Sequence, residues 1–294
     1  MPTAPWSRGS ARGLSQQVPE LRSVGNLLGA AVSVICVYAN WIYDGQVTQL
    51  VGEEGHGLCP FPPRGKRMKR EAMEEAFQQV GRRFGFLDVE ASYYPFKEFK
   101  TTWQRIGSEA TFKVTDYLQD ADLTIIQDFA ACLFTRIQKQ RREVYTPRVR
   151  DYLRSDEFVR LNQEKYLRRS RNLTFSSFGE VYDLDVLLSS LRRKGLLENG
   201  QDTFLSWTDK PNRFRMGYCS VLMKVVAISS ALDRKEVPDY VAEYVLYHEM
   251  LHLKLGTDSL RSYHDADFKR EERRYPRWRE AENWLKKVAL DSVA

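Results

Sequence analysis

Residues 237–256 read VPDYVAEYVLYHEMLHLKLG, and the interpretation of the whole chain depends on this stretch. Pro238 suits the first turn of a helix, and Gly256 suits the position just beyond its end. Between them, His248 and His252 are four residues apart, so their side chains project from one face of that helix. We therefore predict a helix that begins near Pro238 and carries a pair of imidazoles on one side.

Two histidines at this spacing can bind one metal ion together, and Glu249 directly follows the first of them. A carboxylate in that position can take the proton of a zinc-bound water, because the metal lowers the pKa of that water. With only four histidines in 294 residues, a chance match to the pattern has a probability of about 0.4%. We predict His248 and His252 as ligands and Glu249 as general base, against the alternative of two surface or capping histidines.

A catalytic zinc site needs a third protein ligand and an open position for water. His264 is the leading candidate, because three of the four histidines lie within seventeen residues and imidazole is a common zinc ligand. Glu271 and Glu272 are the alternatives, since a carboxylate from a later helix can also bind zinc. The non-functional interpretation of His264 is a solvated loop residue beside Asp265 and Asp267.

The composition is typical of a soluble globular chain rather than a disordered one, with 43% hydrophobic residues, 29% charged residues and a net charge of +6. The four cysteines, at positions 36, 59, 132 and 219, are far apart, which excludes a zinc knuckle or a closely spaced redox motif. A reduced, intracellular setting follows, and we predict a cytoplasmic location.

One stretch argues for a membrane instead. Residues 24–43 contain no charged side chain, follow three arginines, and have the length of a transmembrane helix. Glycine and asparagine residues dilute its apolar character, so a membrane anchor through residues 24–43 is the less favoured alternative. The other interpretations are a buried helix, a poorly ordered leader, or a translation start near Met68.

The chain divides into three predicted parts. Residues 1–67 form an apolar leader and a Gly/Pro-rich linker of uncertain order, because glycine and proline crowd the stretch from 52 to 65. Residues 68–180 form an α+β extension with basic helices, and residues 181–294 form the catalytic domain. The overall class is therefore α+β.

Local patterns predict the elements of these parts. In chain order they are a helix over 71–83, short strands within 88–115, a helix over 126–137, a helix from 147 towards 168, a helix over 183–191, a strand over 203–207, a longer strand over 218–228, the helix that begins at 238, and two short helices around 276.

The helix with its two histidines, followed by His264-Asp265-Ala266-Asp267-Phe268, resembles the SprT-like zinc metallopeptidases. The resemblance covers roughly residues 181–289. Upstream, Tyr182-Asp183-Leu184, Leu205-Ser206-Trp207 and Gly217-Tyr218-Cys219-Ser220 are similar to the family's first helix, first strand and edge-strand region.

The resemblance implies a minimal zincin-like domain, in which a small mixed sheet packs beside the active-site helix. The local patterns place an upstream α/β extension before this domain. It implies one zinc ion held by His248, His252 and His264, with Glu249 as general base, and a protein or peptide as substrate. The chain departs from better-known members because it has no C-terminal cysteine-rich zinc ribbon and has a long upstream region. Both departures leave the substrate open.

The substrate would bind in an extended form. By analogy with the family, a peptide pairs with the strand near Tyr218–Val226, and the alternative is an interior strand. Tyr218 or Tyr263 is a candidate for stabilising the oxyanion, with aromatic core packing as the alternative for each.

A basic segment suggests a further partner. Residues 136–171 hold twelve Lys or Arg and five Asp or Glu, a net charge of +7, with three tyrosines interleaved. A nucleic-acid surface is one interpretation, and SprT-like proteases include some that act on DNA-bound proteins. A solvated pair of charge-rich helices is the other. The alternative function is therefore a nucleic-acid-associated binding protein with a structural or vestigial metal site.

Overall fold

The computed structural model describes residues 70–139, 145–198, 200, 202–255 and 264–291. The predicted leader and linker over 1–67, with the apolar stretch 24–43, lie outside the described residues, as do Gly256 and Tyr263. In the part of the chain that is described, no helix has both the length and the apolar character needed to cross a bilayer.

The upstream part contains one mixed sheet. It is built from α1 (Arg70–Arg83), β1 (Asp88–Tyr94), β2 (Thr102–Ile106), β3 (Glu109–Thr115) and α2 (Leu123–Lys139), with the short 3-10 helix η2 (Asp116–Leu118) after β3. The strand order is β1-β3-β2, and β3 pairs in parallel with β1 and antiparallel with β2.

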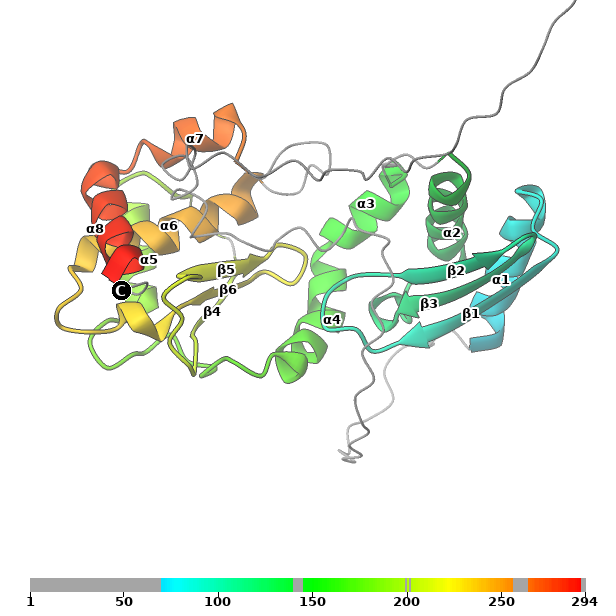
Figure 1. Cartoon of the computed structure of the whole chain (residues 1–294), viewed down its shortest axis with the longest axis horizontal. Coiled ribbons are helices and arrows are strands. Elements are labelled where there is room, and N and C mark those ends of the chain that lie inside the picture. The colour runs from blue at the N-terminus through cyan, green and yellow to red at the C-terminus, as the bar shows by residue number, and fades with distance from the viewer. Residues whose placement is uncertain (1–69, 140–144, 199, 201, 256–263, 292–294) are drawn as a thin grey trace, which may run out of the picture.

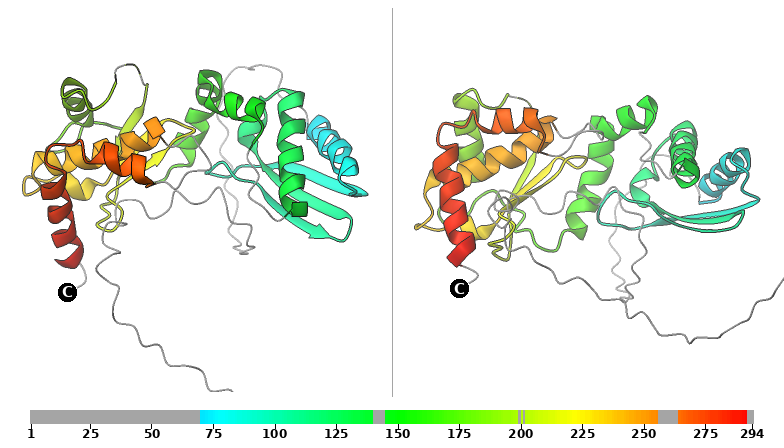
Figure 2. Two further views of the ribbon diagram at one scale, coloured as in Figure 1. Left: turned by 90° about the horizontal axis from the view of Figure 1, so that it is seen from above. Right: turned by 45° about the horizontal axis from the view of Figure 1, so that its top comes forward.

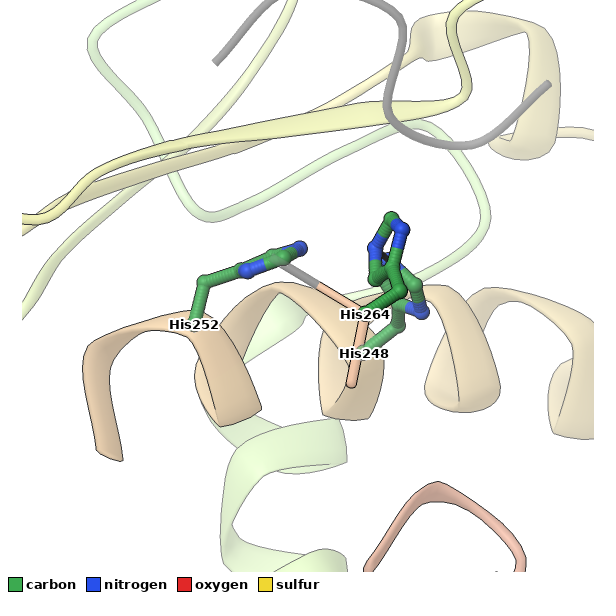
Figure 3. Close-up of side chains that lie close together, drawn as sticks. All are labelled: His248, His252 and His264. Carbon is green, nitrogen blue, oxygen red and sulfur yellow. Dashed lines mark hydrogen bonds between the residues drawn. The ribbon is translucent and has the colours of Figure 1, made fainter. Parts of the chain in front are cut away.

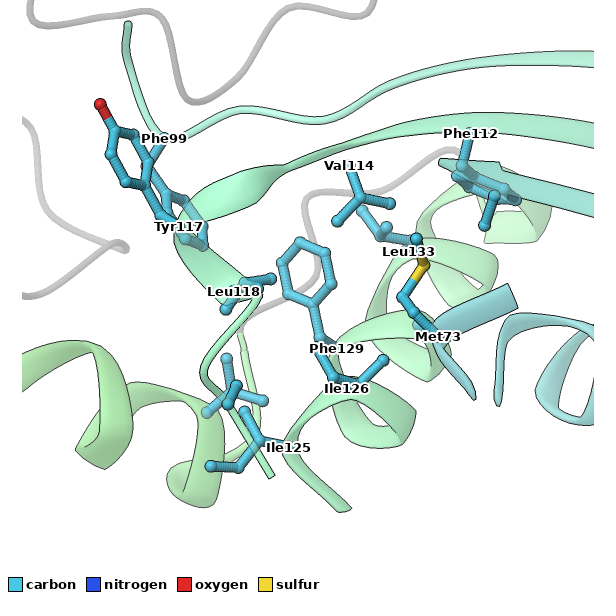
Figure 4. Close-up of a cluster of buried hydrophobic side chains, with 14 of the residues drawn as sticks. Met73, Phe99, Phe112, Val114, Tyr117, Leu118, Ile125, Ile126, Phe129 and Leu133 are labelled. Carbon is cyan, nitrogen blue, oxygen red and sulfur yellow. The ribbon is translucent and has the colours of Figure 1, made fainter. Parts of the chain in front are cut away.

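Alternation along the strands places the core of this part on one face of the sheet. In β3 the residues Ala110, Phe112 and Val114 are buried while Thr111 and Lys113 between them are exposed. Helices α1 and α2 both cover the buried face, as Figure 2 shows. The resulting cluster joins strand residues to α2 residues such as Phe129 and is drawn in Figure 4.

Two helices then lead to the second part. The single helix expected from Pro147 towards Arg168 is wrong, because α3 (Pro147–Arg154) ends and α4 (Asp156–Arg169) begins at Ser155. The Ser155 hydroxyl accepts a hydrogen bond from the backbone N–H of Phe158 at 3.1 Å. This side chain caps α4 and explains the break.

The second part is a small mixed sheet with helices around it. Its elements are α5 (Leu184–Arg193), β4 (Phe204–Trp207), β5 (Gly217–Ser220), β6 (Val225–Ile228), η3 (Ser230–Leu232), α6 (Asp239–Leu255), α7 (Ala266–Glu272) and α8 (Trp278–Asp291). The order is β4-β6-β5, with β6 parallel to β4 and antiparallel to β5. These two small mixed sheets with their helices confirm the α+β class.

The expected long strand over residues 218–228 is also wrong, because the structure has a hairpin there. Strand β5 ends at Ser220, the four-residue turn Val221–Lys224 follows, and β6 returns beside it. Lys224 has a φ of 49°, so it closes the turn in the left-handed region. The hairpin leaves β5 with one hydrogen-bonded neighbour, β6, in the described sheet.

Strand β6 contributes to both hydrophobic cores. Val225 and Ala227 belong to the cluster that contains Tyr166 of α4, whereas Val226 and Ile228 belong to the cluster around α6. The second sheet therefore lies between α4 and α6, an arrangement that can be followed in Figure 1.

Helix α6 is buried on every side rather than along one stripe. All thirteen residues from Val241 to Leu253 are buried, including both histidines and Glu249. A helix enclosed in this way is mostly apolar on every side. Its few polar side chains are removed from water and therefore need specific partners.

Candidate metal centre

Three histidine side chains meet at one point of the second part. His248, His252 and His264 offer ligand atoms that all lie within 4.8 Å of one another. His248 and His252 rise from one face of α6, and His264 lies against them from the segment before α7 (Figure 3). The Nε2 atoms of His248 and His264 are 3.3 Å apart. The structure thus brings together the three histidines that the sequence singled out.

Helix α7 fixes the position of His264. Asp265 caps this helix, and its carboxylate accepts a hydrogen bond from the backbone N–H of Phe268 at 2.9 Å. Phe268 and Glu272 are four residues apart and both buried, so they occupy the inner face of α7. The cap therefore sets the start of the helix and, with it, the place of each side chain that contacts the histidines.

The aromatic ring of Phe268 packs against all three imidazoles. Its centroid lies 5.1 Å from that of His248, 4.7 Å from that of His252 and 4.8 Å from that of His264. This packing restricts the rotamers of the imidazoles and excludes water from one side of the cluster. It also gives a physical reason for the phenylalanine four residues after His264.

Glu272 contacts the far nitrogen of His248. Its Oε1 lies 2.6 Å from Nδ1 of His248, and both side chains are almost fully buried. Burial, the largest single influence, raises the pKa of the Glu272 carboxyl, but the hydrogen bond and charge of His248, a hydrogen bond from Tyr244 and the charge of His264 together lower that pKa below its usual value. An ionised carboxylate keeps the proton on Nδ1, which leaves Nε2 of His248 free to bind a metal.

The other two imidazoles are held in their neutral form. Burial, together with the charge of His248, lowers the pKa of His252 to about 2. Burial and the same neighbour lower the pKa of His264 to about 4, although Glu272 opposes this shift. Metal binding requires unprotonated nitrogens, so both side chains are ready to bind a metal at neutral pH.

These donors fit a zinc ion. In a tetrahedral site with Zn–N bonds of about 2.0–2.1 Å, neighbouring nitrogens are about 3.4 Å apart. The Nε2 atoms of His248 and His264 meet this spacing at 3.3 Å. Among the described residues the cluster has three members, the number that a catalytic zinc site takes from the protein.

Glu249 lies between α6 and the edge strand β5. It is fully buried, and a Cβ atom built on Gly217 would lie 2.8 Å from both Cγ and Oε1 of Glu249. Only a residue without a side chain permits this approach, which accounts for a glycine inside a strand. The carboxylate of Glu249, the residue that follows His248, is therefore held against the backbone of β5.

The two alternative ligands have other partners. The carboxylate of Glu271 forms ion pairs with Lys254 at 3.4 Å and with Arg274 at 2.9 Å. Glu272 contacts the nitrogen of His248 that faces away from His264. Neither belongs to the cluster of donors within 4.8 Å of one another.

Tyr218, the candidate for oxyanion stabilisation that is described, faces away from α6. Gly217 contacts Glu249, and successive strand residues point to opposite faces, so the Tyr218 side chain turns towards the upstream core, against which it packs. This placement favours packing over the oxyanion role.

Two residues of the site were not recognised from the sequence. Glu272 was considered only as an alternative zinc ligand, and the sequence favoured its neighbour Glu271 equally for that role. Gly217 was noted only as part of an edge-strand resemblance, although a glycine within a strand does indicate a close approach of another group.

This fold and site define a class of protein, a small α+β domain whose buried helix presents two histidines and a glutamate to an edge strand. Residues 206–288 match the family described as YgjP-like, metallopeptidase domain. The match runs from β4 into α8 and includes all three histidines and Glu249. It confirms the resemblance to SprT-like zincins for this segment. No curated protein and no solved structure matches the chain.

The family match implies a metal ion and a protein or peptide as substrate, and it supports a hydrolase. It does not extend to the upstream part, α1 to α4, which precedes residue 206.

Proposed function

We propose that this chain is a zinc-dependent metallopeptidase that binds one zinc ion through His248, His252 and His264. The observation that carries the proposal is the convergence of three imidazoles within 4.8 Å, two of them with lowered pKa values, beside a buried glutamate. A zinc ion there supplies a water of lowered pKa and polarises the scissile carbonyl.

The residues of the chain then act in defined roles. Glu249 is the general base: its carboxylate takes a proton from the attacking water and returns it to the leaving amine. Glu272 holds the Nδ1 proton of His248 and so fixes the tautomer of that ligand. Glu271 is engaged with two cations, which supports His264 as the third ligand.

Strand β5 is the surface on which we place the substrate. It has β6 as its one partner in the described sheet, and it lies beside the helix that carries the histidines. An extended peptide that pairs with the free edge of β5 passes Gly217 and therefore Glu249. The proposal thus accounts for the position of the base beside the strand that would bind the substrate.

The direct test compares Glu249→Gln with Glu236→Gln, an exposed glutamate just before α6 that loses the same charge. Hydrolysis of a generic protein substrate such as casein is measured with the zinc content of each variant. We expect Glu249→Gln to bind one zinc ion per chain and to lose at least about 100-fold in kcat/KM. Full activity of Glu249→Gln with bound zinc would contradict the mechanism.

A structural or vestigial metal site is the alternative. Structural zinc sites are closed by four protein ligands, whereas the described cluster has three histidines. This difference supports the catalytic proposal. Zinc that is bound tightly in the absence of any hydrolysis would favour the alternative.

The predicted nucleic-acid surface gains no support from the structure. Several described cations of the segment 136–171 form ion pairs with neighbouring carboxylates, among them Arg148 with Asp128, Lys165 with Asp120 and Arg169 with Asp116. Residues 140–144 of the segment lie outside the described residues. Salt-dependent DNA binding by Glu249→Gln remains the test of this prediction.

A further inference from the structure

Two cations and a tyrosine form a cluster at β5, the strand on which we place the substrate. The guanidinium carbon of Arg215 is 4.7 Å from the centre of the Tyr218 ring, and Nζ of Lys97 is 5.4 Å from the same ring. Both distances are within the range of cation–π contacts. Tyr218 directly follows Gly217, which contacts Glu249.

The two cations come from different parts of the chain. Arg215 precedes β5, whereas Lys97 belongs to the connection between β1 and β2 of the upstream sheet. In Figure 1 this connection reaches from the first sheet towards α4 and the second sheet. The upstream part therefore contributes a positive charge to the neighbourhood of the proposed active site.

Each cation is attached to a fixed piece of backbone. The side chain of Asn212 accepts hydrogen bonds from the backbone N–H groups of Phe214 and Arg215, at 2.9 Å and 2.8 Å. On the other side, the hydroxyl of Tyr117 donates to the carbonyl of Lys97 at 2.6 Å. The backbone that carries each charge is thus held in place before any ligand arrives, which reduces the entropic cost of binding.

The positive charge of the cluster is incompletely neutralised. Glu98 lies 3.8 Å from Lys97, but both side chains are more than 40% exposed, so this contact is weak. No described carboxylate forms an ion pair with Arg215, and its buried Nε has no hydrogen-bond partner there. Burial lowers the pKa of Lys97 and the charge of Arg215 lowers it further, although Glu98 opposes them. Among the described residues, the cluster thus holds two cations and one carboxylate, that of Glu98, which contacts Lys97.

We infer that Lys97, Arg215 and Tyr218 form a subsite for a carboxylate group of the peptide substrate, an inference that rests on the proposed peptidase function. A peptide that pairs with β5 directs alternate side chains to the face where Tyr218 lies. A carboxylate on that face meets the guanidinium of Arg215, whose planar donors suit it, and the ammonium of Lys97. The carboxylate belongs either to an Asp or Glu side chain or to the C-terminus of the peptide.

The test uses zinc-loaded Glu249→Gln, so that binding is measured without hydrolysis. Degenerate, dye-labelled peptide mixtures carry Glu or Gln at one fixed position, each with a free or an amidated C-terminus, and affinity is read from fluorescence anisotropy. We expect the Glu mixtures to bind about fivefold tighter than the Gln mixtures, as for one solvent-accessible ion pair. A dependence on the free C-terminus instead would assign the subsite to the terminal carboxylate.

The control variant is Arg213→Gln, which removes an exposed arginine two residues before Arg215. Added to Glu249→Gln, Arg215→Gln should abolish the preference and Arg215→Glu should reverse it in favour of the Gln mixtures, whereas Arg213→Gln should leave it unchanged. Equal affinity for all mixtures, the absence of saturable binding, or an equal effect of Arg213→Gln would overturn the inference.

Hydrolysis by the wild-type protein separates this inference from the proposed function. Zinc-dependent cleavage without a preference for acidic peptides would support the proposed peptidase function and contradict the proposed subsite. A preference for acidic peptides in the binding assay without any cleavage would support the proposed subsite and contradict the proposed peptidase function.

Discussion

Glu249 lies so close to Gly217 that a single methyl group on the glycine would come within 2.8 Å of the carboxylate oxygen Oε1. The contact joins the proposed general base on α6 to the edge strand β5. Because the base and the strand touch, the distance between the carboxylate and a peptide paired with β5 has little freedom. The proposed catalytic geometry therefore depends on a residue that has no side chain.

Gly217→Ala should displace Glu249 while leaving the three histidines in place. We expect kcat/KM to fall by about 100-fold, because a displacement of about 1 Å is enough for such a loss, while the zinc content stays at that of the wild type. Peptidase assays and metal analysis on the same preparations check this. Cys219→Ala, which shortens a side chain on the same face of β5, is the control. Unchanged activity of Gly217→Ala would show that Glu249 is not positioned by this contact.

Glu272→Gln should weaken metal binding. Glutamine keeps the size of the side chain but loses the charge that holds the Nδ1 proton of His248, so zinc affinity should drop by about 10- to 100-fold. Competition with a chelator measures this affinity. Glu271→Gln is the matched control, since its carboxylate pairs with Lys254 and Arg274 instead. Equal losses in the two variants would argue against an orienting role for Glu272.

Asp233 holds the segment before α5 through three backbone hydrogen bonds. Its carboxylate accepts from the N–H groups of Glu180, Val181 and Tyr182 at 2.5, 2.9 and 2.9 Å, and a Cβ on Gly179 would lie 2.3 Å from Oδ2. Gly179→Ala should lower the free energy of unfolding by about 2 kcal/mol, because charge-assisted hydrogen bonds are lost.

Chemical denaturation measures this loss, and Glu180→Ala, which alters only an exposed side chain of the same segment, should have almost no effect. Asp233→Asn should weaken the same bonds and destabilise the protein in the same direction. If Gly179→Ala were as stable as the wild type, the segment before α5 would not depend on this close approach to Asp233.

The metal-free protein should lose stability on acidification. The pKa of His264 is about 4 in the folded state, against an ordinary value of 6.5, because burial opposes its protonation. Between these two values the unfolded chain binds more protons than the folded one, so stability falls as the pH drops from 6.5 towards 4. Thermal unfolding after chelation, compared at pH 7 and pH 5, measures the loss.

His264→Gln should reduce this pH dependence, since it removes one of the groups that resist protonation. A larger loss of stability in His264→Gln than in the wild type on going from pH 7 to pH 5 would contradict the assignment.

The sequence was most informative where the chemistry is local. The spacing of His248 and His252 and the proline before them predicted helix α6, because one helical turn brings such residues together. His264 was predicted from the scarcity of histidines and from resemblance, and its convergence with the other two depends on α7. No pattern distinguishes a glutamate that binds metal from one that orients a ligand, so the contact of Glu272 required the structure.

The two errors in the fold have different causes. The hairpin between β5 and β6 was missed because its turn, Val221-Leu222-Met223-Lys224, contains none of the residues that usually indicate a turn. The break at Ser155 was readable in principle, since serine followed by two acidic residues is typical of the start of a helix. The burial of α6 on all sides could not be predicted from its own sequence, because it depends on helices and strands distant in sequence.

The two faces of β6 have a consequence for how this protein can be divided. Val225 and Ala227 contact the upstream core, and Val226 and Ile228 contact the core around α6. A fragment that begins at residue 181 would expose one apolar face of its only described sheet to water, and would associate with itself or be degraded. The second part of the chain therefore depends on the upstream part for its packing, and we expect that removing the upstream part would also abolish any activity at the proposed metal centre.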